Sequence, residues 1–228
     1  MPASADHYLK LMRQAWNLAV EWEVLDSSPL THLQLFNPDN RIEHYLSPAD
    51  LEKLLNVLRT APSRPVCHVA LLLLSSGVRL GELLRGRWDE IDKENRVWRI
   101  AASNSKSKRI RSVPLNDAAL EVLSQLDTEG KHDNLFINTR TKKPLVNIHK
   151  VWGRLREKAG IEWLRIHDLR HSYASFLVNH GRTLYEVQQI FGHSDSKVTE
   201  RYAHLSSKTL QEAANAASVA IKGATKAA

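Results

Sequence analysis

Residues 88–113, W-D-E-I-D-K-E-N-R-V-W-R-I-A-A-S-N-S-K-S-K-R-I-R-S-V, decide the fold class, because their apolar spacing differs from that of the rest of the chain. Trp88–Ile91, Val97–Ala101 and Arg109–Val113 are short runs with β-branched and aromatic residues, separated by polar turns, which predicts three strands. The second connection, Ser103–Lys108, is polar and basic, which predicts a flexible loop. We therefore expect a small antiparallel sheet.

The segment before this sheet has the signals of a helix start. Ser47 is a suitable N-cap, Pro48 fits the first turn, and Asp50 stands at the third helical position, as in a capping box. Leucines at helical spacing follow from Leu51 onward. A helix is therefore expected to open the main domain at Ser47.

Further helical patterns flank the strands on both sides. Val66–Ser75 is apolar nearly all round, which predicts a central buried helix, and a short helix is expected over Arg79–Arg85. Helical spacing returns after Asn116, with an extended piece at Leu135–Asn138. The predicted fold class is mainly α with a small antiparallel three-stranded sheet (α+β).

The chain divides into three expected parts. Residues 1–40 hold an amphipathic helix, from Tyr8 to about Leu25, and a linker rich in Ser, Pro, Asp and Asn. Residues 41–205 form the main domain. Residues 206–228 are alanine-rich with a weak apolar stripe, which predicts a tail helix.

The charge and the cysteine content of the chain indicate what kind of partner it binds and in which cell compartment it works. The 228-residue chain has a formal net charge of +7 and a pI near 9.6, which favours a polyanionic partner. The single cysteine, Cys67, cannot form an internal disulfide, and no apolar run is long enough to cross a membrane. Because Asp6, His7 and Lys10 stand where a secretory signal would be apolar, we expect a cytoplasmic protein without a membrane partner.

The first polar cluster is His167-Asp168-Leu169-Arg170. On a helix, His167 and Arg170 are three positions apart and share a face, so both can reach one ligand. A guanidinium matches two oxygens of a phosphate and keeps its charge. The alternative is a surface arginine and a structural histidine on an amphipathic helix.

The second cluster is Ser76-Gly77-Val78-Arg79-Leu80-Gly81-Glu82. Gly77 allows a sharp turn that would place Arg79 at a helix start, near backbone N–H groups. Glu82 could orient Arg79 or pair with Arg85. The alternative is helix punctuation with a solvated arginine.

The third candidate is Lys106, at the tip of the predicted hairpin, where an ammonium could reach a leaving group. Lys108, Arg109 and Arg111 follow it, so a solvated basic run is the alternative.

The fourth cluster is Gly192-His193-Ser194-Asp195, followed by Tyr202. Gly192 is expected to end one helix, and Ser194 or Asp195 to cap the next, which would carry Tyr202. The alternative is a packed aromatic residue and an N-terminal histidine.

Other functional classes are less well supported. Residues 183–203 resemble a helix-turn-helix, which keeps a non-enzymatic DNA-binding regulator open. His167 and His171 are four apart, but Arg170 lies between them and no third ligand is evident, so we expect no metal site. The absence of a GxxxxGK[ST] motif argues against ATP use.

In this order and spacing, the clusters resemble the motifs of the tyrosine recombinases, the phage integrase family. The matching elements are Arg79, Lys106 within residues 106–114 (K-S-K-R-I-R-S-V-P), His167-x-x-Arg170, Gly192-His193-Ser194 and Tyr202. His193 precedes Tyr202 by nine positions, as in the family pattern, and Phe191 stands where the family has leucine.

The resemblance covers about residues 45–204 and implies the catalytic-domain fold of that family. Residues 1–40 look like the last helix of the core-binding domain and its linker. Most of that domain would then be missing, which implies a fragment or a truncated form.

The resemblance also implies a cationic phosphate site. Arg79 and Arg170 would clamp the scissile phosphate, and Lys106 would protonate the leaving 5′ oxygen. Fixed guanidiniums stabilise the charge that builds on phosphate oxygens in the transition state. No cofactor or metal is needed, since the covalent link retains the energy of the phosphodiester.

The remaining implied roles concern the nucleophile and its neighbours. Tyr202 would attack and leave a 3′-phosphotyrosyl link. His167 would transfer a proton, and His193 would hold a phosphate oxygen. Glu82 and His171 would be supporting residues.

The implied partner is double-stranded DNA, with Lys108, Arg109 and Arg111 expected to contact it. The expected assembly is a homotetramer on DNA that exchanges C-terminal tails, assisted by accessory DNA-bending proteins. The implied reaction is site-specific recombination, for integration or excision of a mobile element. A type IB topoisomerase-like enzyme and a non-catalytic DNA-binding regulator are the alternatives.

Overall fold

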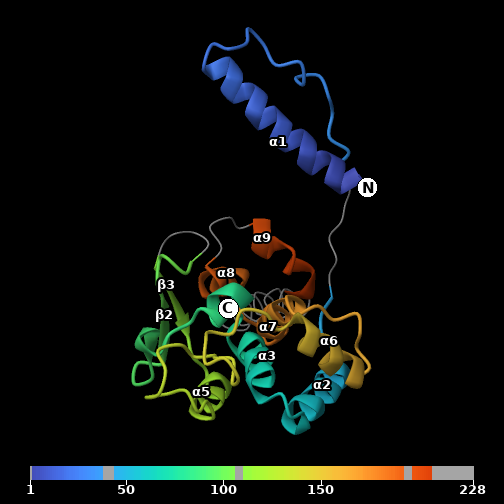
Figure 1. Ribbon diagram of the computed structural model, residues 1–228. Coiled ribbons are helices and arrows are strands. Elements are labelled where there is room, and N and C mark those ends of the chain that lie inside the picture. Colours follow the sequence, from blue (N-terminus) through green and yellow to red (C-terminus); the bar gives the residue numbers. More distant parts are fainter. Residues whose placement is uncertain (1, 38–43, 106–109, 193–196, 207–228) are drawn as a thin grey trace, which may run out of the picture. The chain divides into compact units, whose positions relative to one another are not determined.

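The computed structural model describes residues 2–37, 44–105, 110–192 and 197–206 (Figure 1). Contacts divide the chain into two units, Met1–Glu43 and His44–Ala228. The expected boundary after residue 40 lies within residues 38–43, and nearly all of the expected tail helix lies within residues 207–228; both segments fall outside the described residues.

The N-terminal unit is one long helix with a returning segment. Helix α1 (Pro2–Glu21) begins and ends earlier than the predicted Tyr8–Leu25. It ends where Glu23 adopts a φ of 57°, which reverses the chain. The returning segment is held by the buried Asp6, whose carboxylate accepts the backbone N–H groups of Phe36 and Asn37 at 2.8 and 2.9 Å.

The main unit opens as predicted. Helix α2 (Pro48–Thr60) has Pro48 in its first turn, and the hydroxyl oxygen of Ser47 accepts the N–H of Asp50 at 3.1 Å. The buried helix α3 (Arg64–Ser76) covers the predicted Val66–Ser75 and contains the free, buried Cys67. The short helix α4 (Leu80–Leu84) follows.

The predicted sheet is present, with different strand limits. Strands β1 (Ile91–Asp92), β2 (Val97–Ile100) and β3 (Arg111–Pro114) pair antiparallel in the order β1-β2-β3. The prediction of a strand over Trp88–Ile91 is wrong for most of its length. Residues Trp88–Glu90 form a 3-10 turn, because the carboxylate of Glu90 folds back to accept the N–H of Arg87 at 3.2 Å.

Beyond the sheet, the described part of the main unit consists of helices and the loops between them. The predicted extended piece, Leu135–Asn138, contributes only an isolated bridge between Ile137 and Pro144. The helices are α5 (Asp117–Ser124), α6 (His149–Lys158), α7 (Asp168–Asn179), α8 (Leu184–Phe191) and α9 (Lys197–Glu200), followed by a 3-10 turn, η2 (Ala203–Ser206). Among the described helices, none is both long and apolar enough to cross a membrane.

Helix α3 lies at the centre of the main unit and contacts α2, α5 and α7 (Figure 1). A second apolar cluster contains Tyr173 of α7, Phe191 of α8 and Tyr202. The described candidate site residues lie in α7 and at its N-cap, in α4 and at its N-cap, at the start of β3, and in this second cluster.

Candidate active site

The link between α3 and α4 places Arg79. Gly77 ends α3 with a φ of 63°, and a Cβ there would lie 2.5 Å from Cδ1 of Tyr173, so both the conformation and the space require glycine. Arg79 is the N-cap residue of α4, with its side chain 28% exposed. Its Nη1 donates to Oε1 of Glu82 at 2.8 Å. Arg79 is therefore held at the start of a helix, as predicted, with part of its side chain accessible.

Arg170 is fixed by main-chain oxygens. It lies in the first turn of α7, is 4% exposed, and donates to the carbonyl oxygens of Gly77 and Phe191. Its guanidinium carbon lies 4.2 Å from the centre of the Phe191 ring. Burial, followed by the charges of Arg79 and Arg111, lowers the pKa of Arg170 to about 9.

His167 and His171 lie beside Arg170. His167 is the N-cap residue of α7, and its ring centre lies 4.9 Å from that of His171 in an edge-to-face arrangement. Burial, and then the charge of Arg170, lowers the pKa of His167. Burial, and then the charges of His167 and Arg201, lowers the pKa of His171 to about 3. The His171 ring is therefore neutral near pH 7.

Tyr202, which is 31 positions later in the chain than His171, contacts this group of side chains. It lies in a turn between α9 and η2, so the prediction that a helix carries it is wrong. Its N–H bonds to the carbonyl oxygen of Thr199 at 3.0 Å, a three-residue spacing that departs from the α-helix. The residue is 1% exposed, and its hydroxyl oxygen lies 2.6 Å from Nδ1 of His171.

The described site residues lie close enough together for their charges to act on one another. The pKa of Arg170 responds to Arg79, Arg111, Glu82 and Tyr202. Hydrogen bonds bring the same segments together. Arg170 donates to the carbonyl oxygen of Gly77, two residues before Arg79, and Arg111 and Arg170 donate to the adjacent carbonyl oxygens of Ile190 and Phe191. The ring of His171 contacts the hydroxyl of Tyr202. Lys106, Lys108, Arg109 and His193 lie outside the described residues.

Arg111 does not lie where we expected it from the sequence. It was expected at the DNA surface, but its side chain is 8% exposed and forms an ion pair with Glu82 at 2.6 Å. Glu82 therefore bridges Arg79 and Arg111. Arg85, the other expected partner of Glu82, donates instead to the side-chain oxygen of Asn104 at 2.8 Å.

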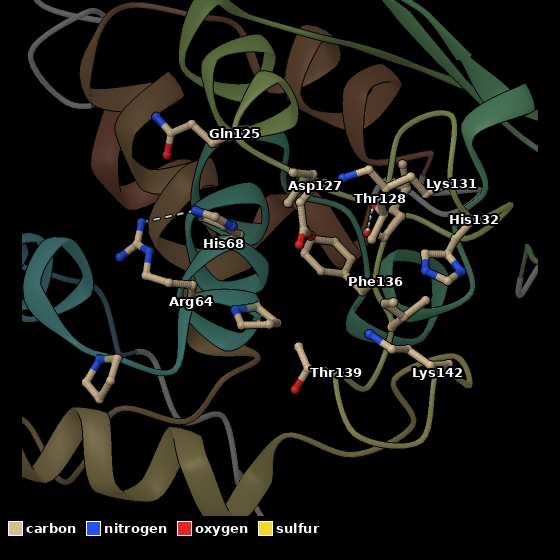
Figure 2. Close-up of a pocket in the computed structure, with 15 residues that line it drawn as sticks. Arg64, His68, Gln125, Asp127, Thr128, Lys131, His132, Phe136, Thr139 and Lys142 are labelled. Carbon is tan, nitrogen blue, oxygen red and sulfur yellow. Dashed lines mark hydrogen bonds between the residues drawn. The ribbon is translucent and has the colours of Figure 1, made fainter.

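A separate pocket of about 700 Å³ lies near the other end of α3 (Figure 2). Its lining includes Arg64, His68, Lys131 and Phe136, and Arg64 contacts the ring of His68 at 3.0 Å. Because α3 runs for roughly 20 Å between Arg64 and Gly77, this pocket is not part of the candidate site. Among the described residues, no cluster of His, Cys, Asp and Glu could hold a metal ion.

Comparison with known proteins identifies the family of this chain. Residues 44–209 match the model of the phage integrase family, and the chain belongs to that family. It is similar to the integrase of Salmonella phage P22, with 31% identity over 197 residues. It is also similar to the tyrosine recombinase XerD of Shewanella oneidensis, with 26% identity over 215 residues.

The chain is shorter than these relatives. The P22 match covers 81% of this chain and 49% of the phage protein, and the XerD match covers 89% and 70%. The chain therefore spans about half the length of the phage integrase.

Two solved structures have the same fold. The Tn1549 transposon integrase, in complex with a circular intermediate DNA, matches with a TM-score of 0.73 and 18% identity, over 88% of this chain and 74% of that one. The XerH recombinase bound to palindromic difH substrate matches with a TM-score of 0.64 and 25% identity, over 82% and 59%. The main unit therefore has the catalytic-domain fold of the tyrosine recombinases.

Proposed function

We propose that this chain is the catalytic part of a site-specific recombinase that cleaves and rejoins DNA through a 3′-phosphotyrosyl intermediate. The observation that carries the proposal is the geometry of three distant segments: Tyr202 contacts His171, and the neighbouring Arg170 binds the carbonyl oxygen of Gly77, in the turn that leads to Arg79. A packed tyrosine and surface arginines would not require this arrangement. The integrase and recombinase relatives support the same reaction on double-stranded DNA.

Each side chain has a chemical role in this proposal. Arg79 and Arg170 stabilise the charge on the phosphate oxygens as Tyr202 attacks. The neutral His171, in hydrogen-bond contact with the phenol, accepts or orients its proton. His167, next to His171, takes part in proton transfer.

Three further roles rest on the family resemblance, because the residues concerned lie outside the described ones. Lys106 protonates the leaving 5′ oxygen, and His193 holds a phosphate oxygen. Lys108 and Arg109 contact the DNA backbone.

The burial of Tyr202 adds a condition. A phenol that is 1% exposed cannot reach a backbone phosphate, so the segment around it must shift when DNA binds. DNA binding and the formation of the active site are therefore coupled.

Tyr202→Phe tests the proposal. A nicked suicide substrate loses the short fragment that would be needed for religation, so a covalent adduct accumulates and is visible on a denaturing gel. The wild type should form the adduct, and Tyr202→Phe should bind DNA and form none. Tyr185→Phe, at an α8 tyrosine that is 69% exposed, is the matched control and should behave as the wild type. An adduct in Tyr202→Phe would refute the nucleophile assignment.

The relatives are integrases and recombinases, which favours strand exchange over a type IB topoisomerase activity. Relaxation of supercoiled DNA without strand exchange would favour the topoisomerase. A protein that binds DNA but forms no adduct would support the non-catalytic regulator.

We further propose a tetramer on DNA that forms through exchange of residues 206–228, with accessory DNA-bending proteins, for integration or excision of a mobile element in the cytoplasm. The proposal rests on the apolar stripe of the tail sequence. Deletion of residues 206–228 should weaken assembly on DNA in a native gel shift. An unchanged assembly state would contradict tail exchange.

A further inference from the structure

Arg111 directs its charge into the protein. It is the first residue of β3, and its Nη2 donates to Oε2 of Glu82 at 2.6 Å. Its Nη1 donates to the carbonyl oxygen of Ile190 in α8 at 2.9 Å. Its aliphatic stem also packs where a side chain at Gly192 would stand. One buried guanidinium thus joins β3, α4 and the end of α8.

Glu82 is shared by two arginines. Besides Arg111, it binds the Arg79 guanidinium at 2.8 Å and accepts the Arg79 backbone N–H at 3.1 Å. Burial alone would raise the pKa of Glu82, but the charge of Arg111 and the hydrogen bonds from Arg79 outweigh it, and the pKa falls below its usual range. Glu82 is therefore an ionised, buried carboxylate.

The ion pair with Glu82 has an electrostatic cost for Arg79. A carboxylate 2.8 Å away orients the guanidinium but cancels most of its field at a phosphate. Arg111 restores one positive charge. Three guanidiniums, on Arg79, Arg111 and Arg170, against one carboxylate leave a net charge of +2, and without Arg111 the cluster would carry +1.

The difference matters for phosphoryl transfer. A phosphodiester has one negative charge, and attack by a phenolate gives a phosphorane with two. A cluster of charge +2 matches the transition state better than the ground state, which is the condition for catalysis.

We propose that Arg111 is a positioning residue that offsets the charge of Glu82, so that Glu82 can orient Arg79 without weakening the phosphate clamp. The inference rests on the proposed function. It differs from a purely structural role, because buried ion pairs can often be replaced by apolar residues at little cost in stability. Moreover, Nε of Arg111 is buried without a hydrogen-bond partner among the described residues, which disfavours stability as its main purpose.

The test compares two suicide substrates. One has a normal scissile phosphodiester, and the other has a methylphosphonate, in which a methyl group replaces one non-bridging oxygen and removes one negative charge. Arg111→Gln should bind the normal substrate as the wild type does but form the adduct roughly 100-fold more slowly. On the methylphosphonate, the difference from the wild type should shrink to less than about tenfold, because less charge needs stabilising. Equal slowing on both substrates would indicate a structural role and overturn the proposal.

The double variant Glu82→Gln/Arg111→Gln gives a second readout. It removes the carboxylate together with the charge that offsets it, so the cluster returns to +2 without a buried ion pair. The double variant should fold, and it should form the adduct at least about tenfold faster than Arg111→Gln does. If Arg111→Gln alone does not fold, the double variant should still form the adduct within about tenfold of the wild-type rate. A folded double variant that is slower than this limit would overturn the proposal.

Arg99→Gln is the matched control, since Arg99 lies on the neighbouring strand β2 with its side chain 55% exposed. It should leave cleavage of both substrates unchanged. If the wild type forms no Tyr202-dependent adduct, the proposed function itself fails. If the wild type forms one and Arg111→Gln is equally fast, only the role of Arg111 is wrong.

Discussion

The hydroxyl oxygen of Tyr202 lies 2.6 Å from Nδ1 of His171, although the two residues are 31 positions apart in the chain. His171 directly follows Arg170, so the turn of α7 that holds the phosphate clamp also holds the acceptor for the phenolic proton. Because the His171 ring is neutral near pH 7, a free nitrogen lone pair can serve as that acceptor. Before DNA binds, α7 therefore carries both Arg170 of the clamp and the histidine that contacts the nucleophile.

Replacing His171 tests this link. His171→Phe removes the proton acceptor, and we expect adduct formation on a suicide substrate to fall roughly 100-fold, within the usual range for a lost acid–base group. His171→Gln keeps a polar group near the phenol and should retain more activity. His149→Phe, at an exposed position of α6, is the control. A wild-type rate for His171→Phe would show that the contact has no role in the reaction.

The same histidine should make stability depend on pH. Its folded pKa of about 3 lies below the ordinary histidine value of 6.5, so between these values the unfolded chain binds more protons than the folded protein. Stability from this group is complete above about pH 6.5 and is lost as the pH falls toward 3. From pH 7 to pH 5, the free energy of unfolding should fall by up to about 2 kcal/mol from His171 alone.

Urea unfolding at the two pH values measures this effect. His171→Gln should show a smaller fall than the wild type, and His149→Gln should follow the wild type. Parallel curves for the wild type and His171→Gln would contradict the lowered pKa.

Arg170→Lys should remove most of the cleavage activity. A lysine ammonium cannot donate to the Gly77 and Phe191 carbonyl oxygens and also present two parallel N–H groups to a phosphate. We expect a loss of about 100-fold or more in adduct formation. Arg182→Lys, at an exposed arginine before α8, should have no effect on the same gel. Cleavage by Arg170→Lys within about threefold of the wild-type rate would count against the clamp.

Glycine substitutions separate backbone strain from steric overlap. Gly77→Ala combines a positive φ with overlap against Tyr173 and should lower the free energy of unfolding by about 3 kcal/mol. Gly160→Ala has a φ of 65° but nothing within 4 Å, so about 1 kcal/mol should be lost.

Gly153→Ala is the control, because it lies within α6 in open space and should be neutral or slightly stabilising. Chemical denaturation gives all three values. If Gly77→Ala and Gly160→Ala were equally destabilised, the close packing against Tyr173 would not matter.

Much of the fold could be predicted from the sequence, because local signals determined it. The Ser47 cap, the buried helix after Arg64 and the left-handed turns at Gly77 and Gly192 are all present. The boundaries that failed depend on tertiary or side-chain bonds. The hydrogen bond from the Arg87 N–H to the Glu90 carboxylate turns most of the first predicted strand into a 3-10 segment. The spacing of apolar residues does not reveal such a bond.

The candidate site was harder to predict in its details. The motifs identified Arg79, Arg170 and Tyr202, but only the fold brings them together. The inward position of Arg111 did have a sequence signal. Arg111 and Val113 are two positions apart on a strand and share a face, and Val113 is fully buried. We gave this alternation no weight, because Lys108 and Arg109 nearby suggested an exposed basic run.

The attachment of Arg170 to two main-chain oxygens has a consequence for divergence. A carbonyl oxygen is present whatever side chain its residue carries, so the carbonyl bond at position 191 is the same with the phenylalanine found here or with the leucine usual in the family. The side chain at position 191 can therefore diverge, by evolution or by engineering, without loss of this anchor for the Arg170 guanidinium.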